Sequence, residues 1–427
     1  MPSDPGKVAN VRAAIRHRSK WITEELARVT ASPAGALESV VTSASPFTWL
    51  ANFSRQLLKG FEHTWGLRYD ACYGGGMGNP GNMTAHDYQN SVFHAVRADV
   101  QGGYARKNCE VSWTDQTNWA VKWALEAVEN VTLRDAIAAE QATITSPTLP
   151  DPSAEGFTRA SFDEDITIGR VVLNFSSTNG AMVGLTDETG VQWASESNPL
   201  GLFTYSLYTN DQMKDLRSEY CPNGCNANEF GKPGMPLDAA ILASPVATGI
   251  WLKKNPKTGG VVEILTLSTM QFELNTGYGA PSAVWARVGL STVAGTRPTL
   301  SYEVTLVNKT STRFAEAGFV TFHPMGDAGE GASARGGEWA MDKLGEWVSP
   351  LDVADGGSMG MHPVWQGMQY IRSQGRAFFR TVDAAVVKFG EKLSAGSGLM
   401  LDRGATPLLL GAPVPRGGRP CACSFRS

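Results

Sequence analysis

Charge is scarce in this chain of 427 residues, and neither sign dominates. Lys and Arg number 37 against 41 Asp and Glu, which gives a formal net charge of −4. Nucleic-acid-binding proteins usually carry a basic patch or a high pI, so this balance argues against a nucleic-acid partner. Hydrophobic residues make up 42% of the chain, which is enough to build a core and argues against a disordered protein.

Long hydrophobic runs are also lacking. No apolar run approaches the ~20 residues that a membrane-spanning helix needs. Residues 1–20 hold five basic residues but no apolar segment after them, which is not the pattern of a secretory signal peptide. We therefore expect a soluble protein without a membrane partner, and the sequence assigns no compartment.

Cysteine is too rare for a disulfide framework, since there are six in the whole chain. Cys221 and Cys225 form one close pair, and Cys421 and Cys423 form another. Neither pair has the CxxC spacing, matched by a second such element, that typifies a zinc site. The sequence predicts buried or surface thiols.

Apolar residues recur at helical spacing before about residue 150. Residues 84–100 and 112–140 are predicted helices, and Ser112 with Asp115 resembles a capping box at the start of the second. Residues also recur on three stripes: Val8, Val11, Ile15, Ile22 and Leu26; Trp49, Phe53, Gln56 and Leu57, with a polar interruption at Gln56; and, within the second predicted helix, Trp119, Trp123, Ala127 and Val131.

The period changes to two beyond a proline-rich segment at residues 146–153. Leu300, Tyr302, Val304 and Leu306 alternate with polar residues, as in a strand with one solvated face. Further β-rich runs lie at residues 166–175, 203–208, 261–267, 284–290, 318–322 and 385–389. Many strands at short spacing, without helices between them, indicate an antiparallel sandwich.

These patterns predict an α+β protein in which a helical region precedes a large antiparallel β-sandwich. The expected boundaries are a helical region at residues 1–145, a linker at 146–160, a β-sandwich domain at 161–395 and a disordered tail at 396–427. The tail is assigned from its low-complexity, basic composition.

The densest polar and aromatic cluster is Phe61-Glu-His-Thr-Trp-Gly-Leu-Arg-Tyr-Asp70. Glu62, Trp65 and Asp70 are candidate substrate-binding residues, because an indole face suits a pyranose ring and carboxylates bind hydroxyls or act as acid and base. His63 is the candidate metal ligand. The alternative is that Trp65 belongs to the core and His63 is a hydrogen-bonded loop residue. Motifs of zinc proteases, serine hydrolases and nucleotide-binding proteins are absent from the sequence.

A second cluster lies between residues 339 and 365. It contains Trp339, Asp342, Lys343, Trp347, Asp352, His362 and Trp365. Tryptophans at this density on a β scaffold are compatible with carbohydrate recognition, and burial in a sandwich is the alternative, which we favour. A third group, Arg313 with Glu316, is predicted to form an ion pair in a polar turn after a strand, worth little if exposed.

Several short motifs together resemble one family. They are Ser3-Asp-Pro-Gly-Lys-Val-Ala9, Glu62-His-Thr-Trp-Gly66, Ser112-Trp-Thr-Asp-Gln116, Phe230-Gly-Lys-Pro-Gly234, Tyr278-Gly-Ala-Pro281, Asn308-Lys-Thr-Ser-Thr-Arg-Phe-Ala-Glu-Ala317, Asp342-Lys-Leu-Gly345, Pro350-Leu-Asp-Val353 and Asp383-Ala-Ala-Val-Val387. In this order they resemble family 5054 among the domains of unknown function, whose members are similar to family 38 glycoside hydrolases of the α-mannosidase type.

The resemblance implies a catalytic β/α barrel, a helical middle region and a β-sandwich of the galactose-mutarotase kind. The motifs begin where the barrel would end. The family's His-x-Asp zinc pair and Asp nucleophile have no counterpart here, and His63 is the one candidate for the later zinc ligand. A single His cannot make the three-ligand open site that catalytic zinc requires.

Two hypotheses of function follow. We favour a glycoside-hydrolase-like protein of carbohydrate metabolism that is non-catalytic, acting as a carbohydrate-binding or structural module and holding no cofactor. The alternative is an active zinc-dependent retaining α-glycosidase whose barrel is missing from this gene model or is supplied by a partner chain. A protein-interaction module has no positive signal in the sequence.

Overall fold

The computed structural model describes residues 5–30, 48–61, 84–98, 109–162, 164–220, 234–291, 298–326, 338–352, 354, 361–389, 406–410 and 421–426. The chain divides into two compact units. The first comprises Met1–Gly78 and His94–Pro147, and the second Asn79–Phe93 and Thr148–Ser427. Over these ranges, no helix combines the length and the apolar character needed to cross a membrane.

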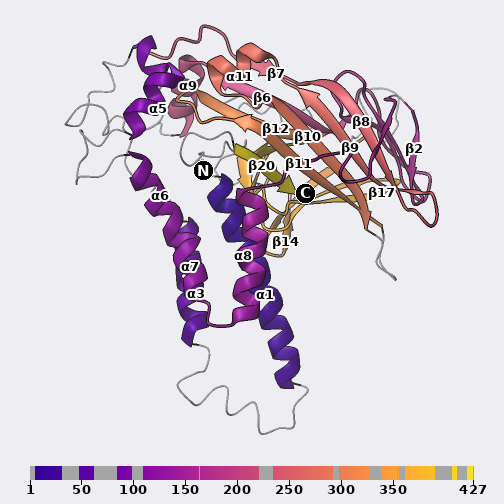
Figure 1. Cartoon of the computed structure of the whole chain (residues 1–427), viewed down its shortest axis with the longest axis horizontal. Coiled ribbons are helices and arrows are strands. Elements are labelled where there is room, and N and C mark those ends of the chain that lie inside the picture. The colour runs from indigo at the N-terminus through magenta and orange to yellow at the C-terminus, as the bar shows by residue number, and fades with distance from the viewer. Residues whose placement is uncertain are drawn as a thin grey trace. The chain divides into compact units, whose positions relative to one another are not determined.

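The first unit is helical, coloured from indigo to magenta in Figure 1. Its elements are α1 (Pro5–Thr30), α3 (Thr48–Leu58), η1 (Lys59–Phe61), α6 (Cys109–Ala120), α7 (Lys122–Glu126) and α8 (Val131–Thr145). A further helix, α5 (Asn90–Ala98), contains the division between the units, and η3 (Ala85–Tyr88) precedes it.

Helices α1 and α8 lie side by side and are joined by polar contacts (Figure 1). Glu140 on α8 accepts a hydrogen bond of 2.6 Å from the Arg16 guanidinium, and its second oxygen lies 2.7 Å from Nε2 of His17. The apolar core of this unit includes Val11, Phe53 and Leu57, as their spacing predicts. The predicted stripe on α1 does not run its full length, because Leu26 is exposed.

The predicted single helix at residues 112–140 is wrong. The chain forms α6, α7 and α8 there, and the first of them begins at Cys109, so Ser112 and Asp115 are not its capping box. Asn130 interrupts the helical run because its side-chain oxygen accepts a hydrogen bond of 2.9 Å from the Leu133 amide and caps α8.

The predicted stripe of residues 119–131 is not the buried face either. Ala120, Ala124 and Val128 are buried, one position further along the chain. Trp119 and Trp123 instead stack on each other at 6.1 Å between ring centroids. Small residues allow helices to approach closely, so the alanine face, and not the tryptophan face, enters the core.

Cys109 corrects the expectation of free thiols. It is completely buried at the start of α6 and is disulfide-bonded. Disulfides form and persist in oxidising environments. The spacing of the cysteines gave no sign of this bond.

The second unit is mainly β-structure. Its strands are β1 (Thr158–Ala160), β2 (Ile166–Ile168), β3 (Val171–Phe175), β4 (Met182–Thr186), β5 (Gln192–Ala194), β6 (Leu200–Tyr208), β7 (Ile241–Ala243), β8 (Val246–Lys254), β9 (Val261–Thr269), β10 (Ala283–Ser291), β11 (Thr299–Lys309), β12 (Ala315–Phe322), β13 (Glu338–Lys343), β14 (Glu346–Val348), β15 (Met361–Pro363), β16 (Gly367–Arg372), β17 (Gly375–Arg380), β18 (Val386–Lys388), β19 (Thr406–Leu410) and β20 (Cys421–Arg426). Two helices, α9 (Asn210–Tyr220) and α11 (Phe272–Tyr278), interrupt them.

Nearly all strand pairs are antiparallel, which confirms the predicted α+β class. The larger sheet has the order β15-β18-β19-β12-β6-β4-β3-β2-β9-β10-β11-β20, and the smaller one is β14-β13-β16-β17. The exception is β2 with β9, which pair in parallel through Ile168 and Val261. Every β-rich run predicted from the sequence contains at least one of these strands.

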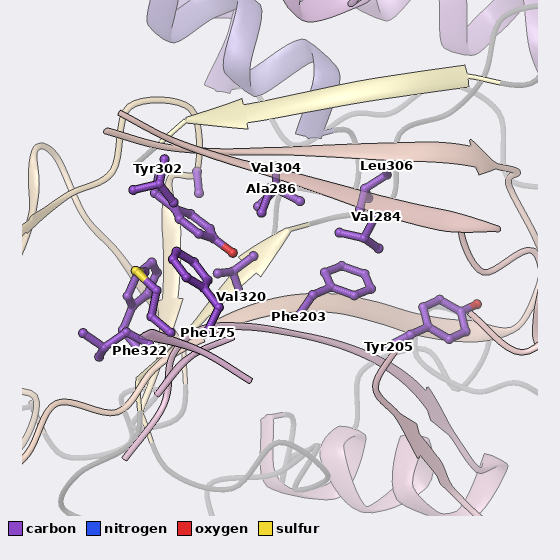
Figure 2. Close-up of a cluster of buried hydrophobic side chains, with 14 of the residues drawn as sticks. Phe175, Phe203, Tyr205, Val284, Ala286, Tyr302, Val304, Leu306, Val320 and Phe322 are labelled. Atoms are coloured by element: carbon purple, nitrogen blue, oxygen red, sulfur yellow. The ribbon is translucent and has the colours of Figure 1, made fainter. Parts of the chain in front are cut away.

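The core of this unit lies between two layers of strands (Figure 2). Val284 and Ala286 of β10, with Val304 and Leu306 of β11, project toward the side chains of β6 and β12 on the opposite side. The predicted apolar positions Tyr302, Val304 and Leu306 of β11 are buried, but Thr305, expected on the solvated face, is buried as well.

One hydrogen bond crosses this core. Tyr302 on β11 reaches the opposite layer and donates a 2.7 Å bond from its buried hydroxyl to the backbone oxygen of Gly201 on β6. Gly201 has φ of +73°, and a Cβ there would come within 2.8 Å of the Tyr302 ring. Glycine is therefore required both for the backbone conformation and for the close approach.

The C-terminal region differs from the disordered tail that its composition predicted. Residues 406–410 pair with β12 as β19, and residues 421–426 pair with β11 as β20. Both are short runs with apolar residues. The prediction rested on the average composition of residues 396–427, which is rich in Gly, Pro and Arg and does not reveal such short runs.

The loop between β13 and β14 generates a prediction. Lys343 pairs with Glu346, so Leu344 and Gly345 form a two-residue hairpin loop, with φ of +60° and +106°. Such loops favour Asn-Gly, whereas positive φ is costly for leucine. We expect Leu344→Asn to raise the free energy of unfolding by about 1 kcal/mol, measured by urea unfolding followed by circular dichroism. The control is Leu351→Asn, which is also exposed but has no positive φ. An equal effect of both substitutions would contradict the strain argument.

Candidate functional site

The four residues singled out as a sugar or metal site cannot be placed. Glu62, His63, Trp65 and Asp70 all lie outside the described residues. Within the described ranges, no group of three or more His, Cys, Asp or Glu residues is arranged to hold a metal ion. The fit of zinc to His63 therefore stays a prediction from the sequence.

The cluster at residues 339–365 is separated by the structure into buried and exposed members. Trp339 is partly buried and packs against the core, where its ring centroid lies 4.9 Å from that of Tyr370 and 5.4 Å from that of Phe379. His362 is buried, with its ring 5.6 Å from that of Phe389. The packing interpretation therefore holds for these two side chains.

Trp347 and Trp365 are instead exposed, at 43% and 38% of their surface. Asp352 is exposed as well, and its amide donates a 3.0 Å hydrogen bond to the Ser349 carbonyl. Trp347 contacts Phe378, a residue that the sequence reasoning missed and that is 49% exposed. In the sequence, Phe378 alternates with Arg376 and Arg380, which would have placed it on the polar side of a strand, and the structure shows that side to be exposed.

Trp347 and Phe378 lie on the two outer strands of the small sheet, β14 and β17. Their ring centroids are 5.7 Å apart at an interplanar angle of 84°, so the two side chains reach each other over the two central strands. The opposite face of those central strands carries Met341, Met368 and Tyr370, which enter the core. The exposed aromatic pair therefore lies on a sheet whose opposite face packs against the core.

Asp342 orders the backbone at one end of this sheet. Its side chain is buried and accepts hydrogen bonds from the amides of Gly345, at 2.7 Å, and Gln366, at 3.0 Å. Its own carbonyl accepts a 3.1 Å bond from the Trp365 amide. One carboxylate therefore joins the β13–β14 loop to the segment that carries Trp365.

Lys343 contributes to the same end of the sheet. Its Nζ donates a 2.5 Å hydrogen bond to the carbonyl of Pro363, and burial lowers the pKa of its ammonium group. This hydrogen bond joins β13 to β15, so the ammonium group of Lys343 serves to hold two strands together.

Two arginines flank Phe378 on β17. Arg376 and Arg380 are both exposed and alternate with it, so the three side chains share one face of the strand. Together, Trp347, Phe378, Arg376 and Arg380 form what we call the aromatic face. Its two aromatic rings can stack on a flat apolar surface, and its two guanidinium groups can donate hydrogen bonds to acceptor atoms of a ligand.

Glu316, predicted to pair with Arg313, belongs to a separate buried polar network in which its ion-pair partner is Lys309. Glu316 on β12 lies 2.9 Å from Nζ of Lys309, and both side chains are buried, at 8% and 4% exposed. The Tyr205 hydroxyl is hydrogen-bonded to the same carboxylate. Arg313 lies over the ring of Tyr88 at 4.5 Å.

Burial dominates the electrostatics of this network. It raises the pKa of Tyr205 well above its ordinary value, and the neighbouring Glu316 carboxylate acts in the same direction. Burial also raises the pKa of Tyr88 to about 12, against the opposing charge of Arg313. Both phenols are therefore neutral at physiological pH, and the network joins β6, β11 and β12 without presenting a reactive group to solvent.

The network yields a stability prediction. Lys309→Met leaves the Glu316 carboxylate buried without its cation, and we expect a loss of about 3–5 kcal/mol in the free energy of unfolding. Replacing both partners, Lys309→Met with Glu316→Leu, is expected to cost less. The matched control is Lys214→Met, which removes an exposed pair with Asp211 at 2.8 Å and should cost at most about 1 kcal/mol. Urea unfolding of the full chain measures all three, and equal losses for Lys309→Met and Lys214→Met would refute the argument.

Comparison with known proteins gives the family but no activity. The family model described as a domain of unknown function, DUF5054, matches residues 1–294. No curated protein matches the chain. The description of this family names no activity, and the aromatic face lies beyond the matched residues. With 294 of its 427 residues matched, the chain belongs to the family of the domain of unknown function DUF5054.

Proposed function

We propose that the β-rich unit is a non-catalytic carbohydrate-binding module, and that the aromatic face is its sugar-binding surface. The observation that carries this proposal is the contact between Trp347 and Phe378, two large aromatic side chains that are nearly half exposed. Contiguous exposed apolar surface on a soluble domain commonly marks a binding site.

The chemistry of the face fits a sugar ring. Aromatic rings offer flat apolar surfaces to the C–H side of a pyranose, while neighbouring polar groups bind its hydroxyls. Trp347 and Phe378 supply the rings, and the indole N–H of Trp347 adds a hydrogen-bond donor. A site mounted on strands is held more rigidly than one mounted on loops, so less ordering entropy opposes binding.

The zinc-dependent hydrolase is the alternative that the sequence left open. It requires a barrel supplied from elsewhere, and its candidate residue His63 lies outside the described residues. Nothing in the described part of the chain favours it over the binding module, so we derive no catalytic step. The similarity to α-mannosidases, and with it a role in carbohydrate metabolism, is part of this proposal.

The binding proposal predicts the effect of removing the rings. Trp347→Ala with Phe378→Ala is expected to lower the affinity for polysaccharide by more than tenfold, because both stacking surfaces are lost. Affinity electrophoresis against α-mannan, pectin, cellulose and chitin derivatives measures retardation of the full chain. Phe272→Ala is the matched control, since Phe272 is exposed on α11 of the same unit. Unchanged retardation of the double variant would contradict the assignment of the site.

The non-catalytic part has its own test. We expect the purified chain to release no p-nitrophenol from p-nitrophenyl α-mannoside and to contain no stoichiometric zinc by elemental analysis. Catalysis requires a nucleophile and an open metal site, and the sequence has no counterpart for the family's nucleophile or first zinc ligands. Bound zinc together with turnover would favour the hydrolase alternative.

A further inference from the structure

The charges beside the aromatic pair bear on which sugars the face would bind. Arg376 and Arg380 stand on either side of Phe378, and each lies roughly 7 Å along the strand from it. In the part of the chain that the structure describes, neither arginine has an ion-pair or hydrogen-bond partner. Two guanidinium groups are thus available beside an exposed ring.

Among the described residues, no acidic side chain of the same sheet forms an ion pair with Arg376 or Arg380. Asp342 is buried and its carboxylate accepts two backbone hydrogen bonds. Glu338 shares the cross-strand row of Ile371 and Arg376, but it lies on β13, with β16 between it and the arginine. Glu346 on β14 is exposed but pairs with Lys343, so it lies on the face opposite Trp347. Arg376 and Arg380 thus outnumber Glu338 among the exposed charges of this face, in a chain whose net charge is −4.

We propose that the aromatic face selects anionic sugars, with the rings of Trp347 and Phe378 holding the pyranose and Arg376 and Arg380 binding its carboxylate or sulfate group. This inference rests on the proposed sugar-binding function and adds the substrate class. Guanidinium groups donate planar, paired hydrogen bonds that match carboxylate and sulfate oxygens. A neutral sugar would engage the rings but leave both guanidinium groups to water.

The arrangement also distinguishes sugar recognition from simple ion exchange. A cationic patch alone would bind any polyanion and lose that binding in salt. With the rings between the cations, a sugar gains from stacking as well as from charge, whereas a polyanion without rings gains from charge alone.

The test is titration calorimetry of the full chain with four soluble polymers: polygalacturonate, dextran sulfate, dextran and polyglutamate. We expect at least one anionic polysaccharide to bind about tenfold more tightly than dextran and polyglutamate. Comparing polygalacturonate with dextran sulfate shows whether carboxylate or sulfate is preferred.

The matched variants separate the two kinds of group. Arg376→Gln with Arg380→Gln should lower the affinity for the anionic polysaccharides to that for dextran, and the affinity for dextran itself should not change. Arg170→Gln with Lys257→Gln removes two exposed cations elsewhere in the same unit and should change nothing. Both double variants alter exposed side chains, and circular dichroism checks that they fold.

The outcomes are distinguishable. Equal affinity for dextran and the anionic polysaccharides overturns the inference and leaves the proposed function standing. Polyglutamate binding as tightly as the anionic polysaccharides also overturns it, because charge alone would then suffice. A preference that survives Arg376→Gln with Arg380→Gln refutes the assignment to these arginines. If no polysaccharide binds, the proposed function fails, and the inference fails with it.

Discussion

The β-rich unit depends on one apolar layer buried between two sets of strands. Removing apolar side chains from water is the dominant favourable contribution to folding, and here it is shared among strands far apart in the sequence. Strands β10 and β11 face β6 and β12 across this layer (Figure 2). The hydrogen bond from Tyr302 to Gly201 then fixes one point of contact between the two sides.

The aromatic face is a consequence of the same core. Successive side chains of a strand point to opposite faces. On β17, Ala377 and Phe379 pack against the core, so the side chains that alternate with them, among them Phe378, lie on the other face. The burial of one face holds the sheet in place, and the other face keeps Phe378 and its two arginines in solvent. Rigidity at the proposed site is therefore inherited from packing behind it.

Two buried carboxylates of this unit, Asp342 and Glu316, are satisfied by partners from neighbouring segments. Asp342 accepts two amides, and Glu316 faces Lys309 and Tyr205. An unpaired buried carboxylate would be costly, so such groups lock neighbouring segments together once they are paired. Their role differs from that of Arg376 and Arg380, which are exposed on β17.

Local pattern determined much of this fold. The spacing of Trp49, Phe53 and Leu57 predicts a helix with one buried face, and the alternation around Tyr302 and Val304 predicts a strand, because periods of 3.6 and 2 follow from backbone geometry alone. The same reasoning failed for Trp119 and Trp123, where the neighbouring alanines enter the core.

For the candidate site too, the sequence predicted only part of what the structure shows. The sequence by itself brought Trp339, Trp347, His362 and Trp365 into one cluster but could not say which of them face solvent. Pairing of β13 with β14 and β16, and of β16 with β17, decided that Trp339 packs against the core and that Trp347 meets Phe378, which is 31 positions away in the sequence. Composition and periodicity thus determined the helical and β-rich parts of this protein. Only the tertiary structure decided the exposed face, because a face is defined by the strands that cover the other side.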